Sequence, residues 1–213
     1  ALVGGHLARV AAHVRGGETA ALPTAERLLG DVAHEILARV LRGADLNPAK
    51  AQAEAEQLFD EEGPRLAAAL FQRGADLARA KARRATGLAV LELARRLLDG
   101  KRSVKSVEEE YEGRAFDTAF AGRPDLVLGP APAVVELKWS GSKYRRLQLE
   151  AGTAHQLAAY SYLVGDGMTW PPVAFFILAD QRFLATDGTA FPGALVTGPG
   201  PEPTWRALAS AHA

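Results

Sequence analysis

The sequence predicts an α/β domain in which a helical first half is followed by a mixed β-sheet with flanking helices. Apolar residues recur at three-and-four spacing through much of the first hundred residues, which is the period of an amphipathic helix. After Gly100, short apolar runs are separated by Gly and Pro, as in strands joined by turns. A chain of 213 residues can bury a core without disulfides. We therefore expect one domain over residues 1–213, with a helical portion over about 1–100 and a sheet-containing core over about 101–213.

The helical portion begins with the clearest amphipathic pattern in the chain. Residues 24–41 place their apolar side chains on one face, and Thr24 is the candidate N-cap of this helix. Gly43 ends the pattern. Further helices are expected over residues 49–59 and 65–98, the second with candidate breaks at Gly74 and Gly87.

The second half contains short strand-like runs with one helical segment between them. The run at residues 173–178 is apolar throughout, which is typical of a strand buried on both faces. The expected strands cover 104–111, 115–120, 125–128, 133–139, 173–178 and 183–186, and the expected helices are 151–164 and a short one from Trp205.

Composition excludes several classes of site. Cysteine is absent, so the chain offers no disulfide, no thiolate zinc site, no cysteine nucleophile and no cysteine-bound iron–sulfur cluster. Lys plus Arg equals Asp plus Glu at 25 each, so any attraction to nucleic acid must come from local clusters. Residues 1–17 contain His and Arg among their apolar residues and lack the unbroken apolar centre of a signal peptide. We expect a cytoplasmic location.

One predicted hairpin brings three charged side chains together. If residues 129–132 form the turn, Leu128 pairs with Ala133, and continuing that register places Asp125 opposite Glu136. Because side chains alternate along a strand, Glu136 and Lys138 share one face, while the residues between them point to the other. The hairpin therefore predicts two carboxylates and one amine around a single point.

Two opposed carboxylates repel each other, and a divalent cation would compensate for their charge. Oxygen ligands suit hard ions, so we expect Mg²⁺ or Mn²⁺, which would polarise a phosphodiester and lower the pKa of a bound water. Lys138 would then orient that water or stabilise charge on the phosphate. The alternative is a surface hairpin whose Asp, Glu and Lys form an exposed salt-bridge cluster.

The same residues carry a resemblance to a known family. Pro124-Asp125 followed by Glu136-Leu137-Lys138 resembles the signature of the PD-(D/E)XK nuclease superfamily. Gln156 and Tyr160, four residues apart on the predicted helix over 151–164, resemble the Gln-x-x-x-Tyr motif of its RecB-type exonuclease branch. Gly30 and His34 are similar to the Gly-x-x-x-His element of that branch. Many RecB-type nucleases bind an iron–sulfur cluster through four cysteines, so the resemblance here is to the branch without that cluster.

The resemblance implies a restriction-endonuclease-like core and a role for each matched residue. His34, Asp125, Glu136 and a backbone carbonyl near Leu137 are expected to hold the metal, and Lys138 to serve the attacking water. Gln156 and Tyr160 are expected to hold the nucleic-acid backbone or to orient Lys138. Glu109 and Glu110, on the strand expected before the hairpin, are candidates for an extra acidic group, with solvent exposure as the alternative.

The resemblance also implies a substrate. We expect DNA, contacted by a local basic group that follows Lys138 directly and contains Lys143, Arg145 and Arg146. For a second basic group, which contains Arg79, Lys81, Arg83 and Arg84, an ordinary solvated helix face is the favoured interpretation. The implied activity is a metal-dependent nuclease of repair, recombination or phage defence, as a partner or appended domain of a helicase. The alternatives are a catalytically inactive module that binds nucleic acid or a partner protein, and a helical interaction protein whose motifs are coincidental.

Overall fold

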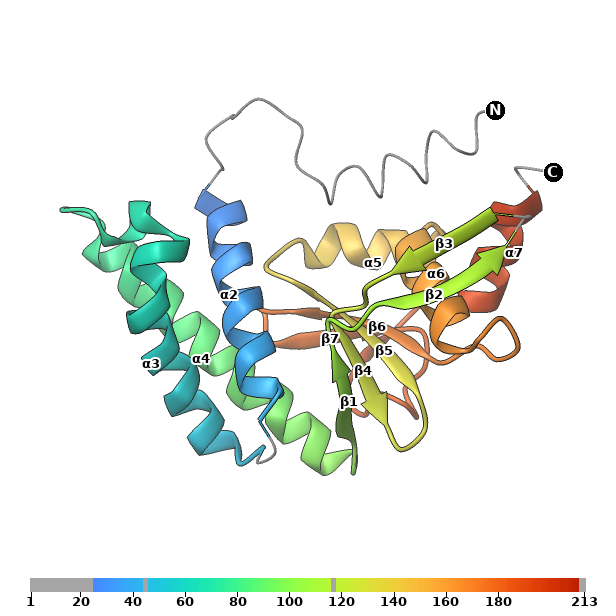
Figure 1. Ribbon diagram of the computed structural model, residues 1–213, viewed down its shortest axis with the longest axis horizontal. Coiled ribbons are helices and arrows are strands. Elements are labelled where there is room, and N and C mark those ends of the chain that lie inside the picture. Colours follow the sequence, from blue (N-terminus) through green and yellow to red (C-terminus); the bar gives the residue numbers. More distant parts are fainter. Residues whose placement is uncertain (1–24, 44–45, 116–117, 211–213) are drawn as a thin grey trace.

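The computed structural model describes residues 25–43, 46–115 and 118–210 (Figure 1). It has the expected α/β architecture: a helical N-terminal portion precedes a mixed six-stranded sheet with helices on both faces. Helices α2, α3 and α4 pack on one face of the sheet, and α5 and α6 pack on the other, with α7 against α6. Within the described residues, no helix has both the length and the apolar character that a membrane span needs.

Helix α2 (Ala25–Leu41) confirms the first predicted helix, and its candidate cap Thr24 lies outside the described residues. Its buried face, which includes Val32, Ile36 and Leu37, is completely shielded from solvent. Helix α3 (Pro48–Leu66) begins at Asn47, whose side chain accepts a hydrogen bond from the backbone N–H of Lys50 at 3.1 Å. The prediction that it ends near residue 59 was too short.

The prediction of one helix over residues 65–98 was wrong in its first part. Residues 65 and 66 end α3, a 3₁₀ turn η1 (Ala68–Phe71) follows, and Gly74 with φ 89° precedes α4 (Asp76–Asp99). The second candidate break, Gly87, lies inside the continuous α4 helix. A β-carbon on Gly87 would lie 2.7 Å from Glu56 Cγ, so this glycine permits close packing of α4 on α3.

The main sheet has the strand order β1-β4-β5-β6-β7-β8. Strands β4 and β5 pair antiparallel with Leu128 opposite Ala133 and Leu126 opposite Val135, which confirms the predicted hairpin register. β5 and β6 are parallel and are joined by the crossover through α5 and α6, and β6 pairs antiparallel with β7 as expected. The strands are β1 (Ser103–Val107), β4 (Leu126–Gly129), β5 (Ala133–Lys138), β6 (Val173–Ile177), β7 (Arg182–Ala185) and β8 (Leu195–Val196).

Strands β2 (Tyr111–Ala115) and β3 (Thr118–Gly122) form a separate two-stranded sheet, which we call the arm. The arm continues the β1–β4 hairpin in the same register, since Val107 pairs with Leu126 and Tyr111 with Gly122. Between them the hairpin bends at residues 108–110 and 123–125, and the arm lies over α6 (Figure 1). The predicted strands over 104–111 and 115–120 were therefore wrong in their bounds: the first ran through the bend at residues 108–110, and the second began in β2 and ended in β3.

Helix α5 (Ser142–Glu150) was not predicted, and the helix expected over 151–164 begins four residues later as α6 (His155–Val164). Helix α5 has one buried residue, Leu149, so its sequence lacks the repeated apolar positions from which an amphipathic helix is predicted. Helix α7 (Pro201–Ser210) contains the expected helix at Trp205.

The sheet separates two apolar clusters. On the side of α2, α3 and α4, the β5 residues Val135 and Leu137 pack in the larger cluster. On the opposite side, Val134 packs with Phe175 and with α5 and α6. Glu136 and Lys138 alternate with Leu137 and therefore lie on the α6 side.

Candidate active site

Helix α2 and strands β4 and β5 meet at Asp125, one residue before β4. Oδ2 of Asp125 accepts a hydrogen bond from the backbone N–H of Leu137 at 2.6 Å. Oδ1 of Asp125 lies 3.6 Å from Nδ1 of His34, and Nε2 of His34 lies 2.8 Å from the carbonyl oxygen of Leu137. A carbonyl only accepts hydrogen bonds, so Nε2 carries the hydrogen in this contact. The Nδ1 atom then faces the carboxylate of Asp125.

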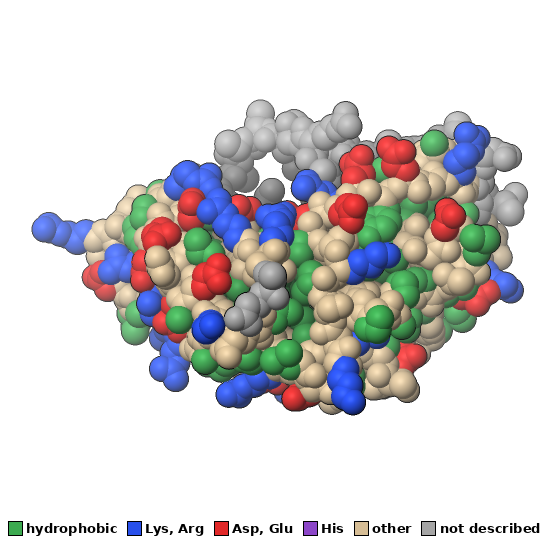
Figure 2. Space-filling model, turned by 60° about the horizontal axis from the view of Figure 1, so that its bottom comes forward, with side chains coloured by type: hydrophobic (Ala, Val, Ile, Leu, Met, Phe, Trp, Pro, Cys, Tyr) green, Lys and Arg blue, Asp and Glu red, His purple; other side chains and the backbone are tan. Residues whose placement is uncertain are grey.

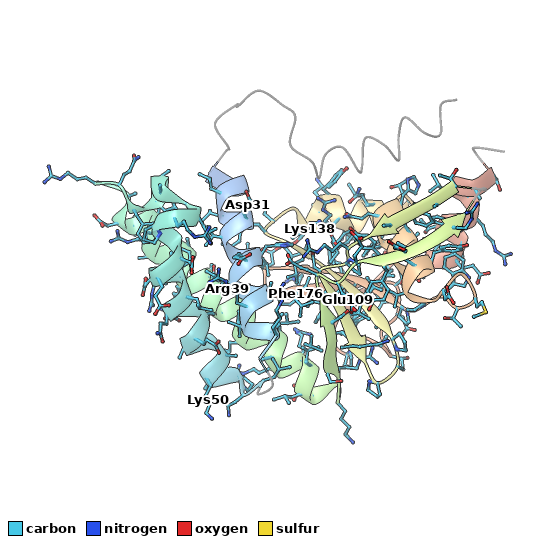
Figure 3. All side chains as sticks on the ribbon, in the orientation of Figure 1. Asp31, Arg39, Lys50, Glu109, Lys138 and Phe176 are labelled. Carbon is cyan, nitrogen blue, oxygen red and sulfur yellow. The ribbon has the colours of Figure 1, made fainter. Side chains whose placement is uncertain are left out.

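Glu136 and Lys138 share the α6 side of β5, as strand alternation predicts, and Lys138 is labelled in Figure 3. Glu136 is only 3% exposed, and its Oε1 accepts a hydrogen bond from Lys138 Nζ at 2.6 Å. Oε2 of Glu136 is buried and has no hydrogen-bond partner among the described residues. A buried oxygen without a partner is costly, so this atom needs a cation or a proton.

Burial raises the pKa of both carboxyl groups above the ordinary value. It raises the pKa of Asp125 to about 6, while the nearby Lys138 charge and the Leu137 hydrogen bond lower it. Burial, followed by the negative charge of Asp125, raises the pKa of Glu136 to about 7, against the opposing effect of Lys138. The site therefore disfavours two negative charges at once unless more positive charge is present.

These groups fit a hard divalent cation by their chemistry: two carboxylates, one imidazole and one carbonyl oxygen, with Glu136 Oε2 lacking a partner. Across residues 25–43, 46–115 and 118–210, no three His, Asp or Glu side chains already form a complete ligand set. The imidazole of His34 contacts the Leu137 carbonyl and the Asp125 carboxylate.

Gln156 and Tyr160 both lie on α6, as predicted, and are joined to each other. Nε2 of Gln156 donates a hydrogen bond to the Tyr160 hydroxyl at 3.0 Å. Burial and the negative charges of Glu136 and Asp125 raise the pKa of Tyr160 to about 12, while hydrogen bonds with Gln156 and the Arg123 backbone lower it. The phenol therefore lies within electrostatic reach of both carboxyl groups, while Gln156 is exposed.

The three basic residues of α5 occupy different environments. Lys143 is exposed in the first turn, and Nε of Arg146 lies 3.4 Å from Oε1 of Glu150. Arg145 is half-buried, with its guanidinium 5.4 Å from the ring centre of Phe175 on β6 and 5.1 Å from that of Tyr144. Arg145 therefore packs on the sheet, and Lys143 and Arg146 face solvent.

The second basic group is balanced by acidic partners. Nη2 of Arg79 lies 2.7 Å from Asp76, and Arg83 pairs with both Glu56 and Asp60. On the face drawn in Figure 2, Lys and Arg side chains are interspersed with Asp and Glu. The solvated-face interpretation of this helix therefore accounts for its arginines.

Glu109 and Glu110 lie in the bend and are exposed, so the prediction that a strand carries them was wrong. Their neighbour Glu108 was missed, although its charge raises the pKa of Asp125 and its backbone N–H donates to the Asp125 carbonyl at 3.0 Å. The Glu108 carboxylate pairs with Arg42 at 3.0 Å. Extending the hairpin register past residue 125 would have placed Glu108 opposite Asp125.

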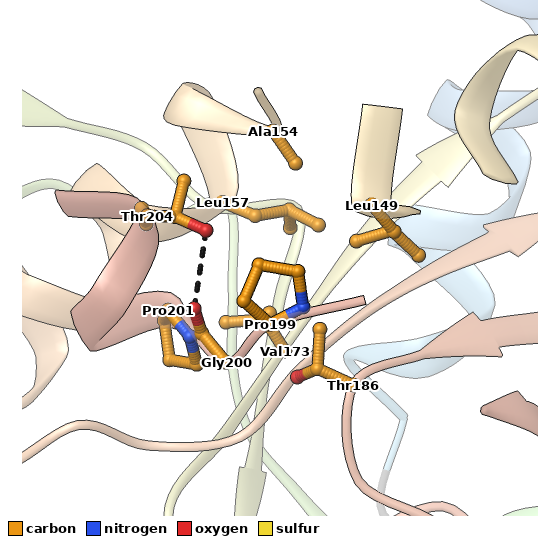
Figure 4. A pocket seen from close by; sticks show the side chains of 10 residues that line it. Leu149, Ala154, Leu157, Val173, Thr186, Pro199, Gly200, Pro201 and Thr204 are labelled. Carbon is orange, nitrogen blue, oxygen red and sulfur yellow. Dashed lines mark hydrogen bonds between the residues drawn. The ribbon is translucent and has the colours of Figure 1, made fainter. Parts of the chain in front are cut away.

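A small cavity lies between α5, α6 and α7 (Figure 4). Leu149, Leu157 and Thr204 line it, and the Thr204 hydroxyl donates to the Gly200 carbonyl at 3.1 Å. None of its lining residues is ionisable. The cavity therefore offers no acid, base or charged metal ligand.

Comparison with known families agrees with this geometry. The model of the PD-(D/E)XK nuclease superfamily matches residues 6–203. The chain belongs to this superfamily. Membership suggests a phosphodiester-cleaving nuclease, and nucleases of this superfamily typically use divalent metals. A search of curated proteins gave no match.

Proposed function

We propose that this PD-(D/E)XK protein is a metal-dependent deoxyribonuclease that hydrolyses DNA phosphodiester bonds with Mg²⁺ or Mn²⁺. The observation that carries the proposal is the convergence at β5: Lys138 lies 2.6 Å from Glu136, whose second oxygen is buried without a partner. An exposed salt-bridge cluster would not explain that burial, because surface carboxylates keep water on both oxygens.

His34, Asp125, Glu136 and the Leu137 carbonyl would hold the ion. When bound, it would polarise the scissile phosphodiester and lower the pKa of a water molecule. The Lys138 ammonium orients the attacking water and stabilises the negative charge that develops on the phosphate. The water oxygen would bond to phosphorus and one ester P–O bond would break. The water loses one proton and the departing oxygen takes one up, so the products are a phosphate end and a hydroxyl end.

Tyr160 lies within electrostatic reach of the same carboxylates, and Gln156 is hydrogen-bonded to Tyr160 on α6. Their hydrogen-bonded pair offers the Tyr160 hydroxyl and the Gln156 amide to a DNA backbone or to Lys138. Lys143, Arg145 and Arg146 belong to the helix that follows Lys138, and we assign DNA phosphate contacts to this helix.

We place the protein in the RecB-type exonuclease branch, because Gly30 and His34 lie on α2 and Gln156 and Tyr160 on α6 in the order of that branch. The chain has no cysteine for an iron–sulfur cluster. The corresponding role is cytoplasmic DNA processing in repair, recombination or phage defence, as a partner or appended domain of a helicase.

The test is degradation of single-stranded, linear double-stranded and circular DNA with Mn²⁺, Mg²⁺ or a chelator, by the wild type and by Lys138→Ala. We expect cleavage only with metal and none by the variant. Loss of linear DNA with survival of the circle would support the exonuclease assignment. DNA binding without cleavage under every condition would identify the inactive binding module instead.

A further inference from the structure

The arm touches α6 through two glycines. Gly113 on β2 and Gly122 on β3 lie on the same side of the arm, facing α6. A β-carbon on Gly113 would lie 2.8 Å from Leu163 Cδ2, and one on Gly122 would lie 2.8 Å from Leu163 Cδ1. Contacts this short do not occur for real side chains, so a methyl group at either place would force the Leu163 side chain or the arm to shift.

The two glycines differ in one respect. The β-carbon on Gly122 would also lie 2.8 Å from Cε1 and 2.9 Å from Cδ1 of Tyr160, whereas Gly113 is near Tyr162 instead, at 4.0 Å. Gly122 is thus the backbone surface against which the Tyr160 ring lies. It is also three residues before Asp125, so the same short segment carries a carboxylate and supports the phenol beside it.

Aromatic packing holds the arm against α6. Tyr162 of α6 stacks on Trp205 of α7 with ring centres 4.8 Å apart, and Phe120 of β3 stacks on both at 6.0 and 5.9 Å. The Tyr162 hydroxyl donates to the Arg114 carbonyl of β2 at 2.7 Å. Such ring pairs stabilise beyond the area that they bury. The arm is therefore anchored to α6 on the side of Tyr162, away from the Tyr160 contact.

We propose that Gly122 is a positioning residue: the arm backbone at this glycine fixes the Tyr160 ring so that its hydroxyl is held toward Asp125 and Glu136. A methyl group at position 122 displaces the Tyr160 ring, so the hydroxyl is no longer held toward Asp125 and Glu136. The activity part of this inference rests on the proposed nuclease function, whereas the placement of the ring can be measured without it.

Gly122→Ala is the test variant, and Gly113→Ala is its matched control, since both add one methyl group against Leu163 and only the first reaches Tyr160. We expect Gly122→Ala to lower kcat about tenfold or more with a small change in KM, as displaced catalytic geometry does. Gly113→Ala should stay within twofold of the wild type. If overlap with Leu163 prevents folding of Gly122→Ala, the double variant Gly122→Ala/Leu163→Ala removes that overlap and keeps the Tyr160 contact.

A double variant tests whether Gly122 acts through Tyr160. In a Tyr160→Phe background, Gly122→Ala should cost no further activity, because the hydroxyl that it displaces is already absent. Fully additive losses would show that Gly122 acts elsewhere and would overturn the proposal.

A readout that needs no cleavage is ¹⁹F NMR of protein labelled with 3-fluorotyrosine. The chain has four tyrosines, and Tyr160→Phe assigns the relevant signal. Gly122→Ala should shift the Tyr160 signal, and Gly113→Ala should leave it in place. An unmoved signal in Gly122→Ala refutes the positioning role. An inactive wild type with the expected shift would instead refute only the nuclease function.

Discussion

The carboxylate of Asp125 is hydrogen-bonded to the backbone N–H of Leu137 at 2.6 Å, across the β4–β5 hairpin. Leu137 is the residue between Glu136 and Lys138, so this single bond ties one acidic group to the strand that carries the other acidic group and the amine. The chain bends at residues 123–125, where regular pairing with β5 has ended at Leu126, and the Asp125 side chain reaches that N–H. The bend is therefore part of the site.

The metal-free protein should lose stability as the pH rises through the titration of the site. The folded-state pKa values, about 6 for Asp125 and about 7 for Glu136, lie above the ordinary values of 3.8 and 4.5. Such groups contribute stability below their ordinary pKa, and this contribution is lost as the pH rises through the folded pKa. Glu136→Gln should therefore stabilise the metal-free protein at pH 8 by a few kcal/mol, at about 1.4 kcal/mol per pKa unit, and not at pH 4. Denaturant unfolding with a chelator, at both pH values, measures this.

Divalent cations should stabilise the wild type and release protons on binding. The cation compensates for the charge of Asp125 and Glu136, so Mn²⁺ should raise Tm, and Glu136→Gln should remove most of that rise. Calorimetric titration near pH 6.5 in two buffers of different ionisation heat should show proton release that disappears at pH 8.5. Glu109→Gln, an exposed acidic residue of the bend, is the control and should respond like the wild type. An equal Tm rise in all three proteins would contradict binding at Glu136.

His34→Ala should weaken Mn²⁺ binding by about ten- to a hundredfold, the loss typical when a metal site is deprived of one supporting group. The fold should survive, because the ring is partly exposed and its helix is held by buried residues on another face. Titration followed by Tm measures the affinity. His155→Ala, which removes an exposed histidine of α6, should bind as the wild type does. Unchanged affinity in His34→Ala would exclude the imidazole from the ligand set.

The basic residues of α5 should differ in what their substitution changes: DNA binding alone, or thermal stability as well. Lys143→Ala and Arg146→Ala should weaken DNA binding and each reduce the slope of log affinity against log salt by about one. Arg145→Ala should lower Tm as well, since its guanidinium packs on Phe175. Fluorescence anisotropy with inactive Lys138→Ala protein at several salt concentrations gives the slopes. A wild-type slope in both exposed variants would place the DNA elsewhere.

The sequence was sufficient to predict the central hairpin of this fold, but not the bend that leads into the arm. The β4–β5 hairpin was predictable because its apolar strands flank a glycine- and proline-rich turn, and side-chain alternation along β5 brings Glu136 and Lys138 to one face. The bend at Glu108 was not predictable, because residues 104–111 have the pattern of one continuous strand. The bend depends on the packing of the arm against α6, which is distant in the sequence. Long-range packing, rather than local pattern, decides such a change of direction.

The candidate site shows the same division. Spacing placed Gln156 and Tyr160 on one helix, and their hydrogen bond confirms that they are neighbours. The contact between His34 and Leu137 spans more than a hundred residues, and only the family resemblance anticipated it. Helix α5 was missed because Leu149 is its one buried residue and the packing of Arg145 on Phe175 cannot be read from local sequence.

The most direct test of the account is a crystal structure with Mn²⁺, read by its anomalous signal. We expect one peak within bonding distance, about 2.0–2.3 Å, of carboxylate oxygens from both Asp125 and Glu136, with Lys138 Nζ beside it. The claim that these three residues form a metal centre would be contradicted by manganese peaks only at other places. In that result Glu136 would remain buried and hydrogen-bonded to Lys138.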